Sequence, residues 1–390
     1  MHQFIDVPLP KLSNLLKSII GFNKNNNKII ESWVLKEDLG FLFSRSSWSL
    51  YFIAKLRQYL FKKETLTIWI PDYFCNSALI FLRKLKVNFI FYPISNNGTC
   101  KESKLNDLLK ENPHPDLFIA THFFGNEINL DVSLDFCKRF DAWLIEDCAH
   151  IFQSKKKYTK AHFSIFSPYK YLAIPEGAIL RINMKKFLKE NKETFFSVYK
   201  DILKKFKKEK RKIYFWILKR IIQKVGFRRK LKLSDFHNDL LSNESEYLIN
   251  PKISSFSLRL FSFEEPDFEM NQNKRWKNYN SWKLYLDNEL FDELELTSPY
   301  LFSYKLDSKE KNFSKSLMED VDKKIIEFLK AGIPVYSWPD LPPEVIEKPS
   351  NHEFAINLRN KTIFLPINSS ISSKLILEKI EKIFKLKNGN

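Results

Sequence analysis

The feature that most constrains the fold is a regular alternation of apolar runs with helical segments between residues 46 and 145. Four short runs have the composition of buried strands, at residues 66–70, 87–92, 117–121 and 142–145. Four segments have helical composition or spacing, at residues 46–61, 78–85, 105–111 and 132–140. Strands that are apolar throughout are typical of parallel sheets covered on both faces. The alternation therefore predicts an α/β fold with a mostly parallel central sheet and helices on both faces.

Polar side chains come directly after two apolar runs. Glu146-Asp147 follows residues 142–145, and Ser167-Pro168-Tyr169-Lys170 follows the run at 163–166. Ligands of such sheets bind beyond the carboxyl ends of the strands. Charged side chains in apolar surroundings are rarely buried unless they are paired or used. The sequence thus predicts a site that joins an acid at 147 with a lysine at 170.

The rest of the chain predicts a second, smaller unit. Helical and strand patterns resume in the C-terminal part, at residues 275–290, 321–331, 335–338, 362–365 and 375–384. A length of 390 residues suits about two domains. We expect a large α/β domain over residues 1–185, a basic aromatic helical insertion over 186–245, and a small α+β domain over 246–390.

Composition excludes several classes of protein. The net charge is +18, but residues 200–232 alone contribute +13, so the charge is local and does not indicate a nucleic-acid binder. The four cysteines form no CxxC pair, which predicts reduced thiols and no metal site. No apolar stretch reaches about 18 residues, and the N-terminus lacks a secretion signal, so we expect a cytoplasmic protein.

Several segments, taken in order, resemble the DegT/StrS-type sugar aminotransferases. They span roughly residues 30–185 and 250–390, and they are Ser44-Arg45-Ser46-Ser47, Ile70-Pro71-Asp72-Tyr73-Phe74-Cys75, Thr121-His122-Phe123-Phe124-Gly125, Ile145-Glu146-Asp147-Cys148-Ala149-His150, Ser167-Pro168-Tyr169-Lys170 with Pro175-Glu176-Gly177, Gly332-Ile333-Pro334-Val335-Tyr336-Ser337-Trp338-Pro339 and Phe364-Leu365-Pro366-Ile367-Asn368. The resemblance implies a fold type I enzyme that uses pyridoxal 5'-phosphate (PLP) and works as a homodimer with composite active sites.

The resemblance gives the acid and the lysine their roles. Lys170 would form the Schiff base with the cofactor aldehyde and carry protons at the substrate carbon. Asp147, with Glu146 as the second choice, would keep the pyridine nitrogen protonated. From the residues alone, Lys170 is more typical of a surface turn, and Asp147 fits a helix cap or loop.

Cofactor-binding roles are expected for six further residues. Ser46 and Ser47 open a helix and, with the hydroxyl of Ser167, would bind the phosphate; ordinary N-capping is the alternative for Ser46. The remaining three are aromatic. Tyr73 or Phe74 would stack on the pyridine ring unless both belong to the core, and His150 either packs near the ring or is structural.

Substrate contacts are expected from the side chains of His122, Arg275 and Asn278, with a solvated helix face as the alternative for the last two. Asn368 is a further open candidate. The chain also departs from the family pattern. Arg45-Ser46-Ser47 replaces the common Gly-Thr-Ala, and the segment with which a partner subunit reaches the phosphate is not recognisable.

Residues 195–235 interleave aromatic and aliphatic residues with many lysines and arginines. Such a segment either packs one side on the domain or lies on an anionic membrane surface. The resemblance predicts transfer of an amino group from a donor such as glutamate to a nucleotide-linked keto sugar for cell-surface polysaccharide. The alternatives are an inactive or altered PLP-fold protein, or a basic peripheral scaffold at the inner face of the membrane.

Overall fold

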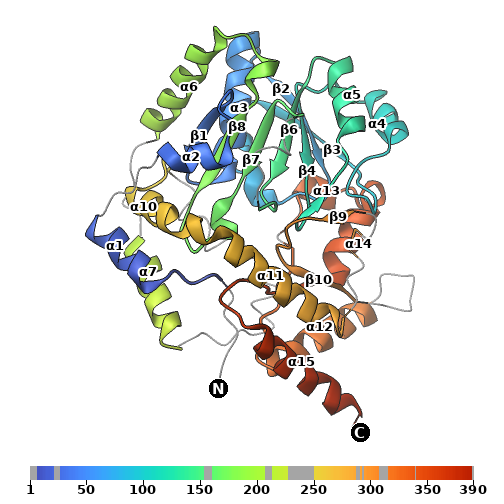
Figure 1. Cartoon of the computed structure of the whole chain (residues 1–390). Coiled ribbons are helices and arrows are strands. Elements are labelled where there is room, and N and C mark those ends of the chain that lie inside the picture. The colour runs from blue at the N-terminus through green and yellow to red at the C-terminus, as the bar shows by residue number, and fades with distance from the viewer. Residues whose placement is uncertain are drawn as a thin grey trace.

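A computed structural model describes residues 7–21, 27–152, 160–206, 213–226, 250–286, 290–291, 294–306, 315–338 and 340–388. Its centre is a seven-stranded sheet in the order β1-β8-β7-β6-β4-β2-β3 (Figure 1). The strands of this sheet are β1 (Leu39–Phe43), β2 (Leu66–Pro71), β3 (Val87–Tyr92), β4 (Leu117–Thr121), β6 (Trp143–Cys148), β7 (Phe163–Phe166) and β8 (Ala178–Ile182).

Five neighbouring strands of the sheet, from β3 to β7, run parallel. β8 runs antiparallel to both β7 and β1. β2, β4, β7 and β8 are buried at every position, because the sheet is covered on both faces. The prediction of an α/β fold with a mostly parallel central sheet is confirmed.

Helices cover the sheet in two groups. α3 (Ser46–Phe61) packs against β1, β7 and β8, and α6 (Asn191–Lys205) packs on α3. α4 (Glu102–Leu109) packs on β3, and α5 (Asp131–Arg139) packs on β4 and β6. α3 has apolar side chains around most of its circumference because it lies between the sheet and α6.

Some predicted elements differ from the structure. Residues 78–85 do not form one helix but two short 3₁₀ turns, Asn76–Leu79 and Leu82–Lys84. The strand predicted at 142–145 continues to Cys148, so Glu146 and Asp147 lie inside β6 and not after it. The strand predicted at 335–338 is reduced to a single bridge between Tyr336 and Phe364.

The C-terminal part forms a second hydrophobic core around Trp282, Phe302, Ile325 and Ile363. Figure 1 shows its helices gathered at one end of the sheet. The elements of this part are α10 (Ser255–Glu264), α11 (Phe268–Lys283), β9 (Glu295–Leu296), β10 (Phe302–Lys305), α12 (Lys315–Lys330), α13 (Pro343–Ile346), α14 (Glu353–Lys361), β11 (Thr362–Leu365) and α15 (Ser373–Asn388). β10 pairs with β11, and β9 pairs with β5 (Asn126–Glu127) of the larger part. The division into domains at 185 and 245 stays a prediction.

Two helices precede the predicted pattern, and a third lies in the middle of its basic segment. α1 (Leu12–Ile20) and α2 (Asn27–Trp33) precede the first strand, and α7 (Ile213–Lys224) lies in the basic segment. Residues 238–249 and much of the basic run at 200–232 lie outside the described residues. Among the described residues, no helix is long and apolar enough to span a lipid bilayer.

Candidate active site

A cavity of about 380 Å³ lies at the carboxyl ends of the parallel strands. Its wall brings together residues from β4, β6, the start of α3 and the turn after β7. Among the residues predicted from the sequence, those that line it are Ser46, Ser47, Phe74, His122, Asp147, His150 and Lys170. Seven residues spread over more than 120 positions of sequence therefore meet at one place, where ligands of parallel sheets bind.

The N-terminus of α3 forms one wall of the cavity. Arg45 is the N-cap in an extended conformation, and no side chain caps the helix. The first amides of a helix lack an acceptor in a preceding turn and carry its positive dipole end; in α3 the amide of Trp48 already donates to the carbonyl of Arg45. The hydroxyls of Ser47 and Ser167 are buried and have no hydrogen-bond partner among the described residues. This set of unused donors fits the phosphate of a bound cofactor.

The buried guanidinium of Arg45 adds positive charge at this end of the cavity. It lies 4.0 Å from the ring centre of Tyr169, one residue before Lys170. A cation at a helix N-terminus is normally unfavourable, because it meets the positive end of the helix dipole. An anion bound between the Arg45 guanidinium and the N-terminus of α3 would relieve that repulsion.

Asp147 projects from β6 into the cavity. Burial raises the pKa of its carboxyl group, and the positive charge of Lys170 partly opposes this rise. Its Oδ1 accepts a hydrogen bond of 3.0 Å from the amide of Ala149, which fixes its direction. The acid and the lysine predicted from the sequence thus interact electrostatically inside one cavity.

Lys170 lies in a short 3₁₀ turn after β7, and its Nζ is 2.8 Å from Nε2 of His150. Burial, and then the charge of Lys170, lower the pKa of His150 well below its usual value, so the ring is neutral. Its Nδ1 accepts from the amide of Phe124 at 3.4 Å, which leaves the ring proton on Nε2. The contact between Nε2 and Nζ places the imidazole directly beside the amine of Lys170, the nucleophile of the predicted site.

His150 is held between two aromatic rings. Its ring stacks on Phe124 at 5.4 Å and on Tyr300 at 4.5 Å. Gly125 makes this possible, since a side chain there would collide with the carbonyl of Ser298 at 1.9 Å. The Gly125 carbonyl also accepts a hydrogen bond from the amide of Thr297. The close approach of these two loops places Tyr300 over the imidazole.

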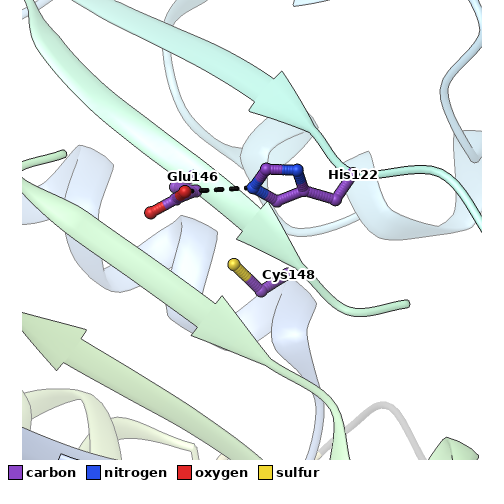
Figure 2. Close-up of side chains that lie close together, drawn as sticks. All are labelled: His122, Glu146 and Cys148. Carbon is purple, nitrogen blue, oxygen red and sulfur yellow. Dashed lines mark hydrogen bonds and ion pairs between the residues drawn. The ribbon is translucent and has the colours of Figure 1, made fainter. Parts of the chain in front are cut away.

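His122 lines the cavity, but both of its ring nitrogens are already used. Nε2 is 3.0 Å from Oε1 of Glu146, and Nδ1 accepts from the amide of Ile128 at 3.0 Å. Figure 2 shows the ring pointing at Glu146, with the thiol of Cys148 beside them. His122 therefore supports β6 directly beneath Asp147, and neither nitrogen is left for a substrate.

The three side chains in Figure 2 also have the donor types of a metal site, with ligand atoms within 4.8 Å of one another. Burial raises the pKa of the Cys148 thiol well above its usual value, and the carboxylate of Glu146 raises it further. A neutral thiol is a poor ligand, because metals bind the thiolate. We interpret the group as a hydrogen-bonded support of the strand.

The structure distinguishes the two aromatic candidates for stacking. Phe74 lines the cavity, whereas Tyr73 is fully buried in the core and stacks on Trp338 at 4.8 Å. Ser167 contributes a buried hydroxyl next to the lysine turn but does not line the cavity wall.

Two predicted substrate residues lie away from the cavity and not on a solvated helix face. Arg275 is buried and donates to the carbonyls of Pro299 and Tyr300. Asn278 is buried, and its Nδ2 donates to the carbonyls of Ile367, Asn368 and Ile371. Both side chains from α11 therefore hold loops in place. Arg275 acts on the site indirectly, because it fixes the segment that carries Tyr300.

Other cavity residues had no predicted role. Thr121, Tyr300, Tyr336 and Ser337 line the wall. Tyr336 and Ser337 belong to one of the segments that resemble the family, and that resemblance was the signal in the sequence that could have identified them as site residues. Tyr300 stands in no recognisable motif, and only the tertiary fold brings it to His150.

Comparisons with known proteins support the predicted fold. No family model matches the chain. The structure superposes on a Helicobacter pylori aminotransferase involved in the biosynthesis of pseudoaminic acid with a TM-score of 0.66 and 15% identity, over 98% of this chain and 100% of the other. It superposes on a DegT/DnrJ/EryC1/StrS aminotransferase from Brucella abortus with a TM-score of 0.65 and 12% identity, over 96% of this chain and 94% of the other. The chain has the fold of these aminotransferases.

A sequence relative covers only part of the chain. The chain is 35% identical over 109 residues to a UDP-4-amino-4,6-dideoxy-N-acetyl-beta-L-altrosamine transaminase from Campylobacter jejuni. The match covers 26% of this chain and 28% of that relative's length. The resemblance inferred from short motifs is thus confirmed as a shared fold of the whole chain.

Proposed function

We propose that the protein is a PLP-dependent aminotransferase of the DegT/StrS type that acts on a nucleotide-linked keto sugar. The observation that carries this proposal is the cavity in which Lys170, beside His150, converges with Asp147 and the unsatisfied hydroxyl of Ser47 at the start of α3. The similarity to sugar aminotransferases supports the substrate class. We place the reaction in the biosynthesis of a cell-surface polysaccharide.

Each residue has a task that its position explains. Bound PLP would supply an electron sink for the bond changes at the substrate carbon. Lys170 would attach to its aldehyde and afterwards move a proton at that carbon. Asp147 would hold a proton on the ring nitrogen, and His150 would keep the lysine amine oriented. Ser46, Ser47 and Arg45 would hold the phosphate.

The test is to identify the lysine that binds PLP. Purified protein is titrated with PLP, the visible absorption of lysine-bound cofactor is recorded, and borohydride fixes the cofactor before peptide mapping. We expect the label on Lys170 and none in Lys170→Ala. Lys160, an exposed lysine ten residues upstream, offers Lys160→Ala as the matched control, which keeps the label. No absorption band in the wild type, or a label on another lysine, contradicts the proposal.

We further propose a homodimer and attachment to an anionic membrane surface through residues 195–235. The resemblance carries the homodimer. The exposed apolar side chains of α7, within a segment of strong positive charge, support the membrane contact. A basic helix on the membrane suits an enzyme that supplies precursors for a surface polysaccharide.

A further inference from the structure

The outer face of α1 is apolar although it points to solvent. Its inward positions, Asn14, Leu15 and Ser18, are buried against the rest of the molecule. Its exposed large apolar residues are Leu12, Leu16, Ile19 and Ile20. Their spacing of four, three and one residues places them on one side of the helix. A helix that only covers a core shows the opposite pattern, with polar residues outside.

α7 has the same inverted pattern. Trp216 and Gln223 are buried, and Trp216 packs on Phe256 of α10. The exposed large apolar side chains on and directly after the helix are Tyr214, Phe215, Leu218, Ile221, Ile222 and Val225. Together the two helices and Val225 account for half of the twenty large apolar side chains that are exposed in the described part of the chain. Such a concentration marks an interaction surface.

α10 brings the two helices to one place. Asn14 of α1 donates to Glu264 near the end of α10, and Arg259, one turn earlier, donates to the carbonyl of Ser18. The C-terminal end of α1 therefore points toward the start of α10, where Trp216 of α7 packs. In Figure 1, α1 and α7 lie at the same edge of the molecule.

We propose that α1 and α7 form one composite surface that binds an anionic lipid membrane. This inference rests on the membrane contact proposed for residues 195–235 and adds α1 to it. Val7 lines the active-site cavity and α1 begins at Leu12, so the chain between them spans at most about 18 Å. Membrane binding holds the cavity close to the lipid surface.

Charge selects the membrane over other occupants. α7 carries Lys219, Arg220 and Lys224, α1 carries Lys17, and residues 200–232 as a whole contribute +13. Apolar side chains with basic neighbours are typical of helices that lie in the interface of anionic lipids. A second copy of the chain would bring two such positive segments together, and the repulsion disfavours that contact. A soluble polyanion would leave the apolar stripe without a partner.

The test measures binding of full-length, PLP-loaded protein to vesicles. Phosphatidylcholine vesicles with added phosphatidylglycerol are compared with pure phosphatidylcholine by co-sedimentation, at low and high salt. The variants are Leu16→Gln/Ile20→Gln on α1 and Leu218→Gln/Ile222→Gln on α7. The matched control, Leu284→Gln/Ile346→Gln, removes two equally exposed apolar side chains elsewhere; Leu284 and Ile20 are both 72% exposed.

We expect the wild type and the control to bind only the anionic vesicles and to dissociate as salt rises. Each of the two other variants should bind at least about tenfold more weakly. Normal binding by the α1 variant overturns the composite surface, and no binding by the wild type overturns membrane attachment. An oligomer that the α1 and α7 variants dissociate, seen by sedimentation velocity, assigns the surface to a second copy and also overturns the proposal. None of these results changes the lysine label, which tests the enzymatic proposal separately.

Discussion

At the scale of single residues, the sequence predicted which residues meet at the cavity better than it predicted the residues that support them. Asp147 is the penultimate residue of β6 and Lys170 lies in the turn after β7, and the order of strands alone brings such positions together. Arg275 and Asn278 do not line the cavity, because backbone carbonyls satisfy both side chains, which the pattern of α11 does not reveal. Tyr300 was missed, because its contact with His150 depends on the approach of a distant loop to Gly125.

Asp147→Asn tests the role of the buried carboxyl group. Asparagine keeps the shape and accepts the hydrogen bond from the Ala149 amide but carries no negative charge. We expect kcat for amino transfer to fall by about a hundredfold or more, because the charge on the cofactor ring loses its partner. PLP should still be bound by Lys170, and the absorption spectrum of the bound cofactor checks that. Unchanged kcat would remove Asp147 from the mechanism.

At the scale of elements, strands buried on both faces were easy to predict, and boundaries at polar residues were not. β6 continues through Glu146 and Asp147, because backbone pairing with β4 and β7 outweighs the low strand preference of acids. β1 and β8 form an antiparallel pair that the alternation did not reveal. Residues 78–85 form two short turns although their composition suits a helix.

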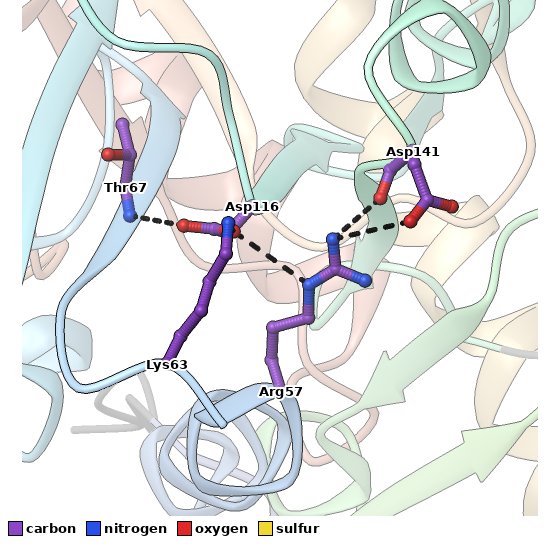
Figure 3. A network of polar contacts seen from close by, with 5 residues as sticks. All are labelled: Arg57, Lys63, Thr67, Asp116 and Asp141. Atoms are coloured by element: carbon purple, nitrogen blue, oxygen red, sulfur yellow. Dashed lines mark hydrogen bonds and ion pairs between the residues drawn. The ribbon is translucent and has the colours of Figure 1, made fainter. Parts of the chain in front are cut away.

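Polar contacts join α3 to the sheet at the edge opposite the cavity (Figure 3). Arg57 is 3% exposed, donates to the carbonyl of Asp141 at 2.7 Å, and lies 3.9 Å from Asp116. Its guanidinium also packs over the rings of Phe61 and Trp143. The network ties one helix to the start of two strands.

Arg57→Leu should lower the free energy of unfolding by about 3 kcal/mol, because it removes the donor to the Asp141 carbonyl and a buried cation beside the Asp116 carboxylate. Urea unfolding measures the change. Lys63→Met is the matched control: Lys63 also pairs with Asp116 but is half exposed, so the loss should stay below about 1 kcal/mol. Equal losses in both variants would show that Arg57 contributes no more than a surface pair.

At the scale of the whole molecule, the sequence predicted a second unit but not the packing of the N-terminal helix on a much later part of the chain. The apolar spacing of residues 321–331 and 375–384 predicted helices of the second core, which contains Ile325 and Ile376. α1 packs on α10, which lies more than 230 residues later in the chain. That contact leaves no periodic signal, because the inward face of α1 is polar in part and its outward face is apolar.

The pH dependence of global stability follows from buried neutral histidines. Burial, and then the charges of Lys186 and Arg57, lower the pKa of His162 to about 4. Its Nδ1 accepts from the amide of Leu144 at 3.1 Å, so the native state needs the neutral ring. In the unfolded chain the pKa is about 6.5. The unfolded state therefore binds the proton first as pH falls, and stability is lost from pH 6.5 down toward 4.

His162→Gln isolates this contribution, since the glutamine oxygen can accept the same amide and does not titrate. Between pH 7.5 and pH 5, the wild type should lose about 2 kcal/mol more of its free energy of unfolding than the variant does. Urea unfolding at both pH values gives the two losses. His150, whose pKa is also lowered by burial, acts in the same direction in both proteins and cancels from the difference. Parallel losses in the two proteins would mean that the ring of His162 accepts a proton in the folded state, and that the Leu144 contact does not hold it neutral.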